Sequence, residues 1–266
     1  MPTGEFYTLI TGGSSGIGKA LAMECASRKM NLIIVALPGL ELEQTANEIR
    51  NTYKVKVRCL EMDLTNREAP LLVYKWCEQL GYTVNMLINN AGLAGTAIFD
   101  ESSLLYSDSR IQLNIRALVL LCRVFLPDMK KLPKAYILNT GSMSAFYNIP
   151  YKSLYSASKA FVVSFTRSLK EELKGSTVSI SVVCPNGVHT NKGTKARIES
   201  HGYKGKMVEL PPDAVAKIAI DGLLKGKTMI IPGAINKIIH LTGKLIPFKL
   251  KQYFLLKEFR KEVNTV

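Results

Sequence analysis

The 266-residue sequence lacks several features that would assign it to other classes of protein. It has five cysteines, an odd number, and no pair is spaced as C-x-x-C. Because most of them lie in apolar runs, we expect buried, reduced thiols and a reducing compartment rather than a disulfide framework. No apolar run is long enough to span a bilayer. No internal repeat, low-complexity segment or linker-like composition divides the chain.

Acidic residues are also scarce, with 21 Asp and Glu against 35 Lys and Arg, for a formal net charge of +14. Residues 192–266 hold 15 of the basic and 6 of the acidic residues. This surplus could favour anionic lipid, nucleic acid or a phosphorylated ligand, but a basic solvated face explains it equally well. No nucleic-acid-binding motif is present, so we expect no nucleic-acid partner. Residues 1–7 do not resemble a signal peptide, and we expect a cytoplasmic protein, with peripheral membrane contact as an alternative.

Hydrophobic residues make up 47% of the chain and the mean hydropathy is +0.10, which is enough for a substantial core. Short apolar runs alternate with segments of helical periodicity. Strands are predicted over 5–10, 31–36, 55–60, 84–88, 135–139, 178–184 and 229–231, and helices over 19–28, 40–50, 71–80, 103–124, 154–173 and within 208–224. This alternation predicts an α/β fold in which one domain, residues 1–266, is a Rossmann-type doubly wound parallel sheet of about seven strands with helices on both faces.

A glycine-rich turn follows the first predicted strand and opens the first helix. Gly12 would permit the tight turn, Gly16 would let a ligand approach the backbone, and Gly18 would allow close packing of helix and strand. The amide groups at the start of such a helix can hold a pyrophosphate. In this strand–turn–helix context the pattern predicts a dinucleotide site.

Tyr155 and Lys159 are four residues apart, so on a helix they share one face. A phenol alone titrates near pH ~10 and is a poor acid or base at neutrality. A lysine cation beside it favours the phenolate and lowers the pKa toward the working range. The spacing alone is common by chance, and a solvated helix face is the alternative.

The motifs together, in the order T-G-x-x-x-G-I-G (11–18), N-N-A-G (89–92), Ser142 and Y-x-x-x-K (155–159), resemble the short-chain dehydrogenase/reductase family over about residues 5–232. The resemblance implies an NAD(P)-dependent enzyme that interconverts a secondary alcohol and a ketone, and it gives no metal site. A non-catalytic dinucleotide-binding sensor or scaffold with a docking tail is the alternative, although a sensor would not need the complete catalytic set.

The resemblance implies four catalytic residues. Tyr155 would exchange a proton with the substrate oxygen, and Lys159 would bind the nicotinamide ribose and lower the pKa of Tyr155. Ser142, 13 residues before Tyr155, would hydrogen-bond the substrate carbonyl. Asn114 would bind a water that links Lys159 to solvent, unless it is a polar residue capping a bend.

The resemblance also assigns cofactor contacts: Gly12, Ser14, Ser15, Gly16, Ile17, Gly18, Leu37, Asp63, Leu64, Asn90, Ala91, Gly92, Tyr155, Lys159, Pro185, Val188 and Thr190. Asp63 is equally well explained as a cap of the following segment. Asn186 replaces the glycine usual in the P-G-x-V-x-T motif of the family, and asparagine tolerates a left-handed backbone better than most residues.

The choice of cofactor depends on the residues that follow the second strand. An acid there would select NAD, and a base there or beside Gly16 would select NADP. The chain has Leu37 and Pro38 after that strand and Ser15 before Gly16, so neither signature is present. With no acid to repel a 2′-phosphate in a basic chain, we expect NADP(H) to be slightly favoured over NAD(H).

The substrate is expected to be lipophilic, such as a steroid, fatty-acyl or sphingoid-like compound. Its pocket would be lined by 93–96, by 144–151 with Phe146 and Tyr147, by 186–187 and by a substrate lid over 191–206. The basic amphipathic extension over 234–266 either lies on an anionic membrane or, as we favour, folds over the pocket or a subunit interface. The family's habit of pairing through the helix at 154–173 suggests a homodimer or homotetramer.

Overall fold

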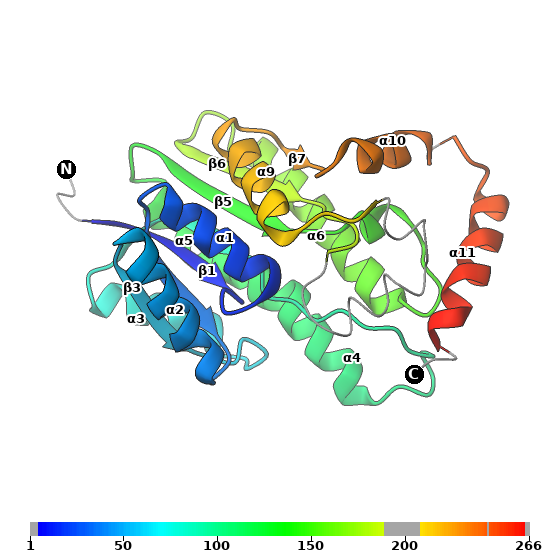
Figure 1. The fold of residues 1–266 in the computed structure, drawn as a ribbon, viewed down its shortest axis with the longest axis horizontal. Helices are drawn as coiled ribbons and strands as arrows, with labels where there is room; N and C mark the ends of the chain where they lie inside the picture. The colour runs from blue at the N-terminus through cyan, green and yellow to red at the C-terminus, as the bar shows by residue number, and fades with distance from the viewer. Residues whose placement is uncertain (1–4, 189–207, 244, 264–266) are drawn as a thin grey trace.

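The computed structural model describes residues 5–188, 208–243 and 245–263 (Figure 1). Seven parallel strands form one sheet in the order β3-β2-β1-β4-β5-β6-β7. They are β1 (Phe6–Thr11), β2 (Asn31–Ala36), β3 (Val57–Glu61), β4 (Thr83–Asn89), β5 (Ala135–Thr140), β6 (Val178–Val183) and β7 (Met229–Ile230). The predicted fold class is therefore confirmed, and the bounds predicted for β2 match those observed.

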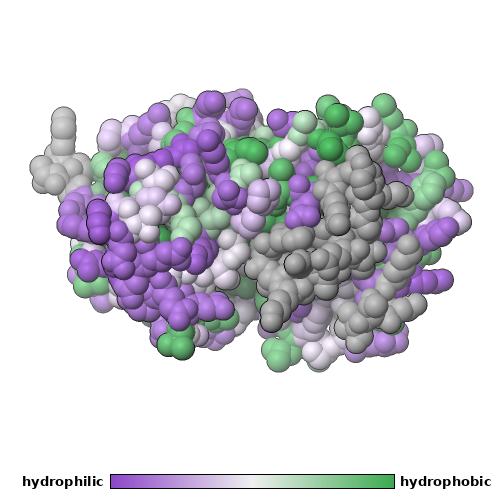
Figure 2. Space-filling view, in the orientation of Figure 1, coloured by the Kyte–Doolittle hydropathy of each residue, from purple (hydrophilic) through white to green (hydrophobic). Residues whose placement is uncertain are grey.

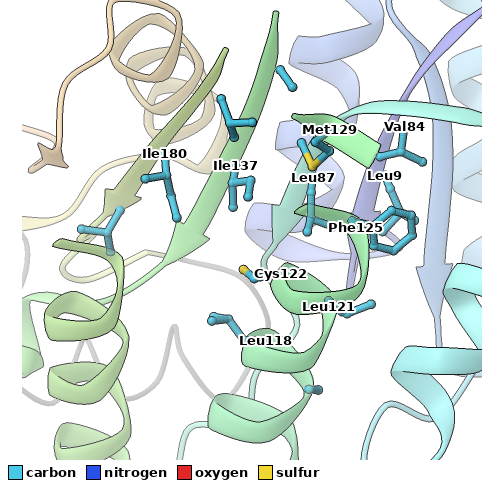
Figure 3. Packing of buried hydrophobic residues seen from close by; sticks show 14 of the residues in the cluster. Leu9, Val84, Leu87, Leu118, Leu121, Cys122, Phe125, Met129, Ile137 and Ile180 are labelled. Carbon is cyan, nitrogen blue, oxygen red and sulfur yellow. The ribbon is translucent and has the colours of Figure 1, made fainter. Parts of the chain in front are cut away.

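Two layers of helices cover the sheet because its central strands are apolar on both faces. One layer consists of α1 (Gly16–Ser27), α2 (Leu40–Tyr53) and α9 (Pro212–Leu224). The other consists of α3 (Ala69–Gln79), α5 (Leu118–Met129) and α6 (Ser153–Glu172), and α4 (Leu104–Ile111) extends from α5 with no residue buried. Figure 3 shows Leu118, Leu121, Cys122 and Phe125 of α5 beneath Leu87 of β4 and its neighbours in this second layer.

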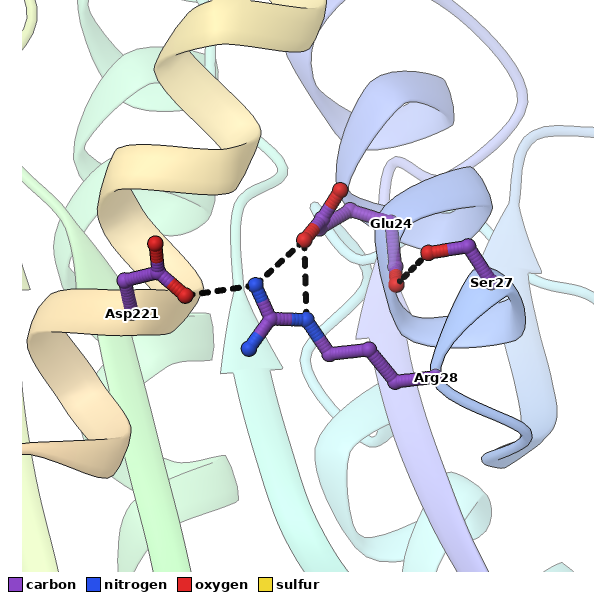
Figure 4. Close-up of polar contacts among 4 residues, drawn as sticks. All are labelled: Glu24, Ser27, Arg28 and Asp221. Atoms are coloured by element: carbon purple, nitrogen blue, oxygen red, sulfur yellow. Dashed lines mark hydrogen bonds and ion pairs between the residues drawn. The ribbon is translucent and has the colours of Figure 1, made fainter.

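An ion-pair cluster joins α1 and α9 in the first layer. The Arg28 guanidinium, just after α1, lies 2.6 Å from Oδ1 of Asp221 on α9 and also contacts Glu24 (Figure 4). The contact holds the pKa of Asp221 below its usual value. Because Asp221 is partly exposed, this pair orients α1 and α9 more than it stabilises them.

The helix predicted over 103–124 is interrupted. Between α4 and α5 the segment Gln112–Ala117 forms a π-helix, and such turns are frequent at functional sites. Another short helix, η2 (Met143–Phe146), follows β5. Two further helices, α10 (Ala234–Thr242) and α11 (Phe248–Val263), end the described chain, separated near Pro247 as the sequence suggests.

No disulfide is formed, and four of the five cysteines are buried; Cys59 is partly exposed. Within the described residues, none of the helices combines the length and the apolar character that crossing a bilayer would require.

Candidate active site

The order of the strands places a crevice at the carboxyl ends of β1 and β4, because the chain winds away from β1 in one direction and from β4 in the other. A cavity of about 1040 Å³ opens there. Its lining includes every cofactor contact expected from the sequence except Thr190, which is outside the described residues. The predicted lid over 191–206 is likewise outside them.

The glycine-rich turn and the loop after β4 are joined by hydrogen bonds. Asn90 Nδ2 donates to the carbonyl oxygens of Thr11 and Gly12, each at 3.2 Å. The Thr11 hydroxyl oxygen accepts from the backbone amides of Asn90 and Ala91, each at 3.0 Å. These bonds fix the floor of the cavity, and they use Thr11, whose importance the sequence alone did not reveal.

At two positions, Gly12 and Gly18, the backbone leaves no place for a side chain. A side chain at Gly18 would put its Cβ 1.9 Å from the carbonyl oxygen of Gly12, and Gly12 itself has a φ of +64°. Helix α1 therefore starts directly against the turn. Its N-cap residue, Ser15, makes no side-chain capping bond, so the first amides of α1 face the cavity without a side-chain acceptor.

Lys159 is buried, with 5% of its surface exposed, and its ammonium points into the protein. Nζ donates to the carbonyl oxygen of Thr140 at 2.8 Å and lies 5.9 Å from the centre of the Tyr155 ring. Burial lowers the pKa of Lys159 from its ordinary 10.5 to about 8, an effect that the Cys184 thiolate would oppose. Tyr155 and Lys159 line the same cavity.

Ser142 lies at the start of η2, on the same cavity wall. Its hydroxyl oxygen accepts from the Ser144 amide at 3.1 Å, which leaves the hydroxyl proton available for another acceptor. The nearby Ser144, the other serine of this segment, is buried and does not line the cavity. The structure therefore brings Ser142, and not Ser144, beside Tyr155 and Lys159.

Asn114 does not line the cavity and is 1% exposed, within the π-helix. Its Oδ1 accepts from the Leu93 amide at 2.8 Å, and its Nδ2 donates to the Leu93 carbonyl and to Ser158 Oγ. Both amide hydrogens are thus used in holding the loop at 92–93 against α6. The Asn114 side chain therefore holds the backbone beside Lys159 in place without lining the cavity itself.

Asp63 caps its own turn. Its Oδ1 accepts from the amide and the hydroxyl of Thr65, at 2.8 and 2.7 Å. Helix α3 begins only at Ala69, so Asp63 is not the N-cap of that helix. The side chain nevertheless lines the cavity, together with Leu64, Leu37 and Glu41. Glu41, in the first turn of α2, was not identified from the sequence because nothing in its local pattern points to a ligand.

Two of the aromatic residues expected to line the substrate pocket, Phe146 and Tyr147, pack against α10. Phe146 packs against His240 of α10, with ring centres 4.2 Å apart, and the Tyr147 hydroxyl donates to the Ile239 carbonyl at 3.1 Å. Neither lines the described cavities. Helix α10 contacts both residues, and their place on the wall of the substrate pocket stays a prediction.

On the substrate side, the described cavity wall is mostly apolar. It includes Leu93, Ala94, Leu105 and Leu113, with Asn186 from the loop after β6. Thr140 lies beside Lys159 with its hydroxyl buried and without a hydrogen-bond partner within the described residues. Such an orphaned group suits a site that a ligand completes.

The chain matches the family model for short chain dehydrogenase over residues 7–200. It belongs to the short-chain dehydrogenase family. It is 33% identical over 190 residues to 17-beta-hydroxysteroid dehydrogenase type 3 from Homo sapiens, covering 69% of this chain and 59% of that protein. It is 31% identical over 192 residues to the very-long-chain 3-oxoacyl-CoA reductase of Bos taurus, covering 69% and 60%. The chain thus spans about 60% of the length of these relatives.

Solved structures give the same family. A short-chain dehydrogenase from Sphingobium yanoikuyae in complex with NADPH has a TM-score of 0.78 and 28% identity, covering 90% of this chain and 93% of that one. A short-chain dehydrogenase/reductase from Burkholderia phymatum in complex with NAD has a TM-score of 0.77 and 25% identity, covering 91% and 95%. Structures with this fold therefore bind either dinucleotide.

The cavity fits a dinucleotide on its own geometry. It is bordered by a helix N-terminus without a side-chain cap and by a turn whose glycines exclude side chains. Its volume lies at the upper end of the range for small-molecule sites, which reaches ~1,000 Å³. The residues that would hold the pyrophosphate are Ser14 to Gly18, and those near the nicotinamide would be Tyr155, Lys159 and Val188.

Proposed function

We propose that this chain catalyses the NAD(P)-dependent interconversion of a secondary alcohol and a ketone on a lipophilic substrate. The observation that carries the proposal is that Tyr155, Ser142 and buried Lys159 line the same cavity as the uncapped N-terminus of α1. A proton donor, an oxygen-binding hydroxyl and a phosphate-binding helix end are thereby joined in one site. Membership of a family of dehydrogenases and reductases supports it.

The bound dinucleotide supplies or accepts the hydride in this chemistry. Tyr155 gives its hydroxyl proton to the substrate oxygen in the reductive direction and takes it back in the oxidative direction. Ser142 donates its free hydroxyl proton to the same oxygen, and two pre-placed donors stabilise the negative charge that develops there. The buried Lys159 ammonium, held by the Thr140 carbonyl, places a positive charge 5.9 Å from the centre of the Tyr155 ring, where it would stabilise negative charge on the phenol oxygen.

Asn114 acts as a positioning residue in this proposal. Its amide joins the Leu93 backbone to Ser158 of α6, which is adjacent to Lys159 in the chain. It thereby fixes the distance between the loop after β4 and the helix that carries Tyr155 and Lys159. The water that the family resemblance assigns to Asn114 stays a prediction.

The substrate class rests on the relatives and on the cavity wall. The two relatives are named for a hydroxysteroid and a very-long-chain 3-oxoacyl-CoA, both with large apolar parts. Leu93, Leu105 and Leu113 give this chain an apolar wall of the kind that would accept such compounds.

Cofactor choice is a separate part of the proposal. The comparisons do not resolve the slight preference for NADP(H) expected from the sequence, and the lining of the cavity argues against it. Glu41 and Asp63 line the adenosine end, whereas Lys159 is the single cation among the described lining residues. A 2′-phosphate would meet carboxylates without a basic partner from that lining. We therefore propose weak discrimination, with NADH bound at least as tightly as NADPH.

A homodimer or homotetramer through α6 remains part of the proposal. Phe161 is 41% exposed on this helix and stacks on Phe165, with ring centres 6.0 Å apart. An exposed aromatic ring stacked on a partly buried one, on a helix that packs against the sheet, is typical of an interface. Size-exclusion chromatography with light scattering should give a dimer or a tetramer, and Phe161→Asp should shift it toward monomer. A cytoplasmic location is likewise only expected.

The test of the activity is Tyr155→Phe, which removes one oxygen and keeps the ring. Turnover of a panel of lipophilic ketones should fall by about 10²–10⁴, while the binding of NADH, followed by its fluorescence, should change little. Tyr136→Phe, on β5 and outside the cavity lining, is the matched control. Unchanged turnover in Tyr155→Phe would contradict the mechanism, and loss of NADH binding would show a structural defect instead.

A further inference from the structure

Helix α11 turns charged residues toward the body of the protein and leaves large apolar side chains exposed. Its inward face carries Lys251, Glu258 and Glu262 together with the partly buried Leu255 and Phe259, and Glu262 is 7% exposed. Glu262 accepts a hydrogen bond from Thr96 Oγ1 at 2.8 Å and pairs with Lys152. The opposite face carries Leu250, Tyr253, Phe254 and Leu256, all between 41% and 61% exposed. A surface helix in water normally places these two kinds of residue the other way round.

Helix α10 and the connection to α11 continue this apolar face. Asn236 and His240 of α10 are buried against the body, and Ile235, Ile238 and Leu241 on the other side are exposed. We call the whole exposed set the tail surface: Ile235, Ile238, Leu241, Leu245, Ile246, Phe248, Leu250, Tyr253, Phe254 and Leu256. Hydrophobic atoms gather at the upper right of Figure 2, over α10 and toward α11.

The charges around the tail surface are of one sign. Lys237, Lys249, Lys257 and Arg260 are exposed among or beside the apolar residues. The acids of this part of the chain, Glu258 and Glu262, face the body instead. Over the described residues from 234 to 263, the outer face is therefore apolar and basic.

We propose that the tail surface binds the interface of an anionic lipid bilayer, lying in its plane rather than crossing it. The apolar side chains would enter the acyl boundary, and the lysines and arginine would meet anionic headgroups. A second copy of this chain fits less well, because a symmetric contact through this surface would set these cations against one another with no outward acid on α10 or α11 among the described residues to balance them.

The proposal rests on the surface alone and does not depend on the proposed activity. It combines the two interpretations of the extension that the sequence left open: one face of α11 packs on the body near Thr96 and Lys152, and the other is free for lipid. Docking would place the substrate side of the chain, which carries Thr96, close to the membrane.

The test is co-sedimentation of the full chain with vesicles. One set is phosphatidylcholine alone and the other contains a minority of phosphatidylglycerol. We expect the wild type to sediment with the anionic vesicles at least about tenfold more strongly than with the neutral ones, and added salt to weaken the binding.

Two double variants separate the contributions. Leu241→Ser with Phe254→Ser should reduce binding to anionic vesicles at least about tenfold, and Lys249→Glu with Lys257→Glu should remove the preference for anionic lipid. Leu80→Ser with Lys130→Glu, on α3 and α5 ends remote in sequence from the tail, is the matched control and should bind like the wild type. Circular dichroism checks that each variant is folded.

Three results would overturn the proposal. The wild type could stay in the supernatant with both kinds of vesicle. Binding could persist in both tail variants. Light scattering could show that the tail variants convert a dimer to a monomer without any change in sedimentation with lipid, in which case the tail surface is an interface between copies.

Discussion

Lys152 Nζ lies 2.7 Å from Glu262 Oε2, and both side chains are less than a tenth exposed. These residues are 110 positions apart, yet the pair holds the last helix against the segment that leads into α6. The ring of Phe259 lies beside the same ammonium, 4.6 Å from its centre. The pair therefore couples the position of α11 to the loop next to Tyr155.

Removing one partner of this pair should loosen α11. Glu262→Gln leaves the Lys152 ammonium in a dry site without its carboxylate, a change that typically costs ~3–5 kcal/mol. Hydrogen exchange should show faster exchange of the α11 amides in this variant. The double variant Lys152→Met with Glu262→Met should recover much of the protection, because it leaves no unpaired charge.

The control for that experiment is the exposed pair of Lys174 and Glu171. Glu171→Gln should leave the exchange of α11 unchanged. If Glu262→Gln also leaves it unchanged, the ion pair does not hold the helix.

The buried Lys159 makes stability depend on pH. Its pKa is lowered to about 8 in the folded chain from an ordinary 10.5. Between these values the unfolded chain binds more protons than the folded one, so this group adds stability as pH rises through that window. Relative to Lys159→Met, the wild type should gain stability from pH ~7 to ~10. Urea unfolding measures the difference, and Lys174→Met, at an exposed site, should show none.

Gly18 should tolerate no side chain. Gly18→Ala would place a methyl group 1.9 Å from the Gly12 carbonyl oxygen and 2.6 Å from Asn90 Nδ2. The glycine-rich turn would have to move and Asn90 would lose its bonds to that turn, so dinucleotide affinity should fall at least about tenfold. NADH fluorescence titration measures the loss. Gly81→Asn, at a turn with open space around it, should bind NADH like the wild type.

Glu41 should influence cofactor choice. Glu41→Gln removes a carboxylate from the adenosine end of the cavity. The affinity for NADPH should rise severalfold relative to that for NADH, because a 2′-phosphate no longer meets this negative charge. Glu48→Gln, on the same helix but outside the cavity lining, is the control. If Glu41→Gln and Glu48→Gln have the same ratio of NADPH affinity to NADH affinity, the 2′-phosphate of NADPH does not bind near Glu41.

Much of the fold could be predicted because strands covered on both faces are continuous apolar runs. Asn31–Ala36 is such a run and its bounds are those of β2. The glycine-rich turn could be predicted because its steric requirement is local. The π-helix at Gln112–Ala117 could not, because its sequence keeps the pattern of an α-helix; it holds Asn114, which bonds to Leu93 and Ser158 in distant segments.

The surroundings of the partly buried aromatic residues could not be predicted from the sequence. Phe146 and Tyr147 have the composition of a substrate pocket, and α10 contacts both of them. Periodicity gives the faces of a helix without saying which face meets the protein. Glu41 was missed for a related reason, since its place on the cavity wall depends on how α2 packs beside β2.

The sequence by itself determined the alternation of strands and helices, the tight turn before α1 and the shared face of Tyr155 and Lys159, because each depends on residues a few positions apart. Only the tertiary structure decided that Lys159 is buried, that Asn114 holds the backbone beside the cavity without lining it, and that α11 turns its acids inward. These properties depend on which segments, distant in the chain, exclude water from one another.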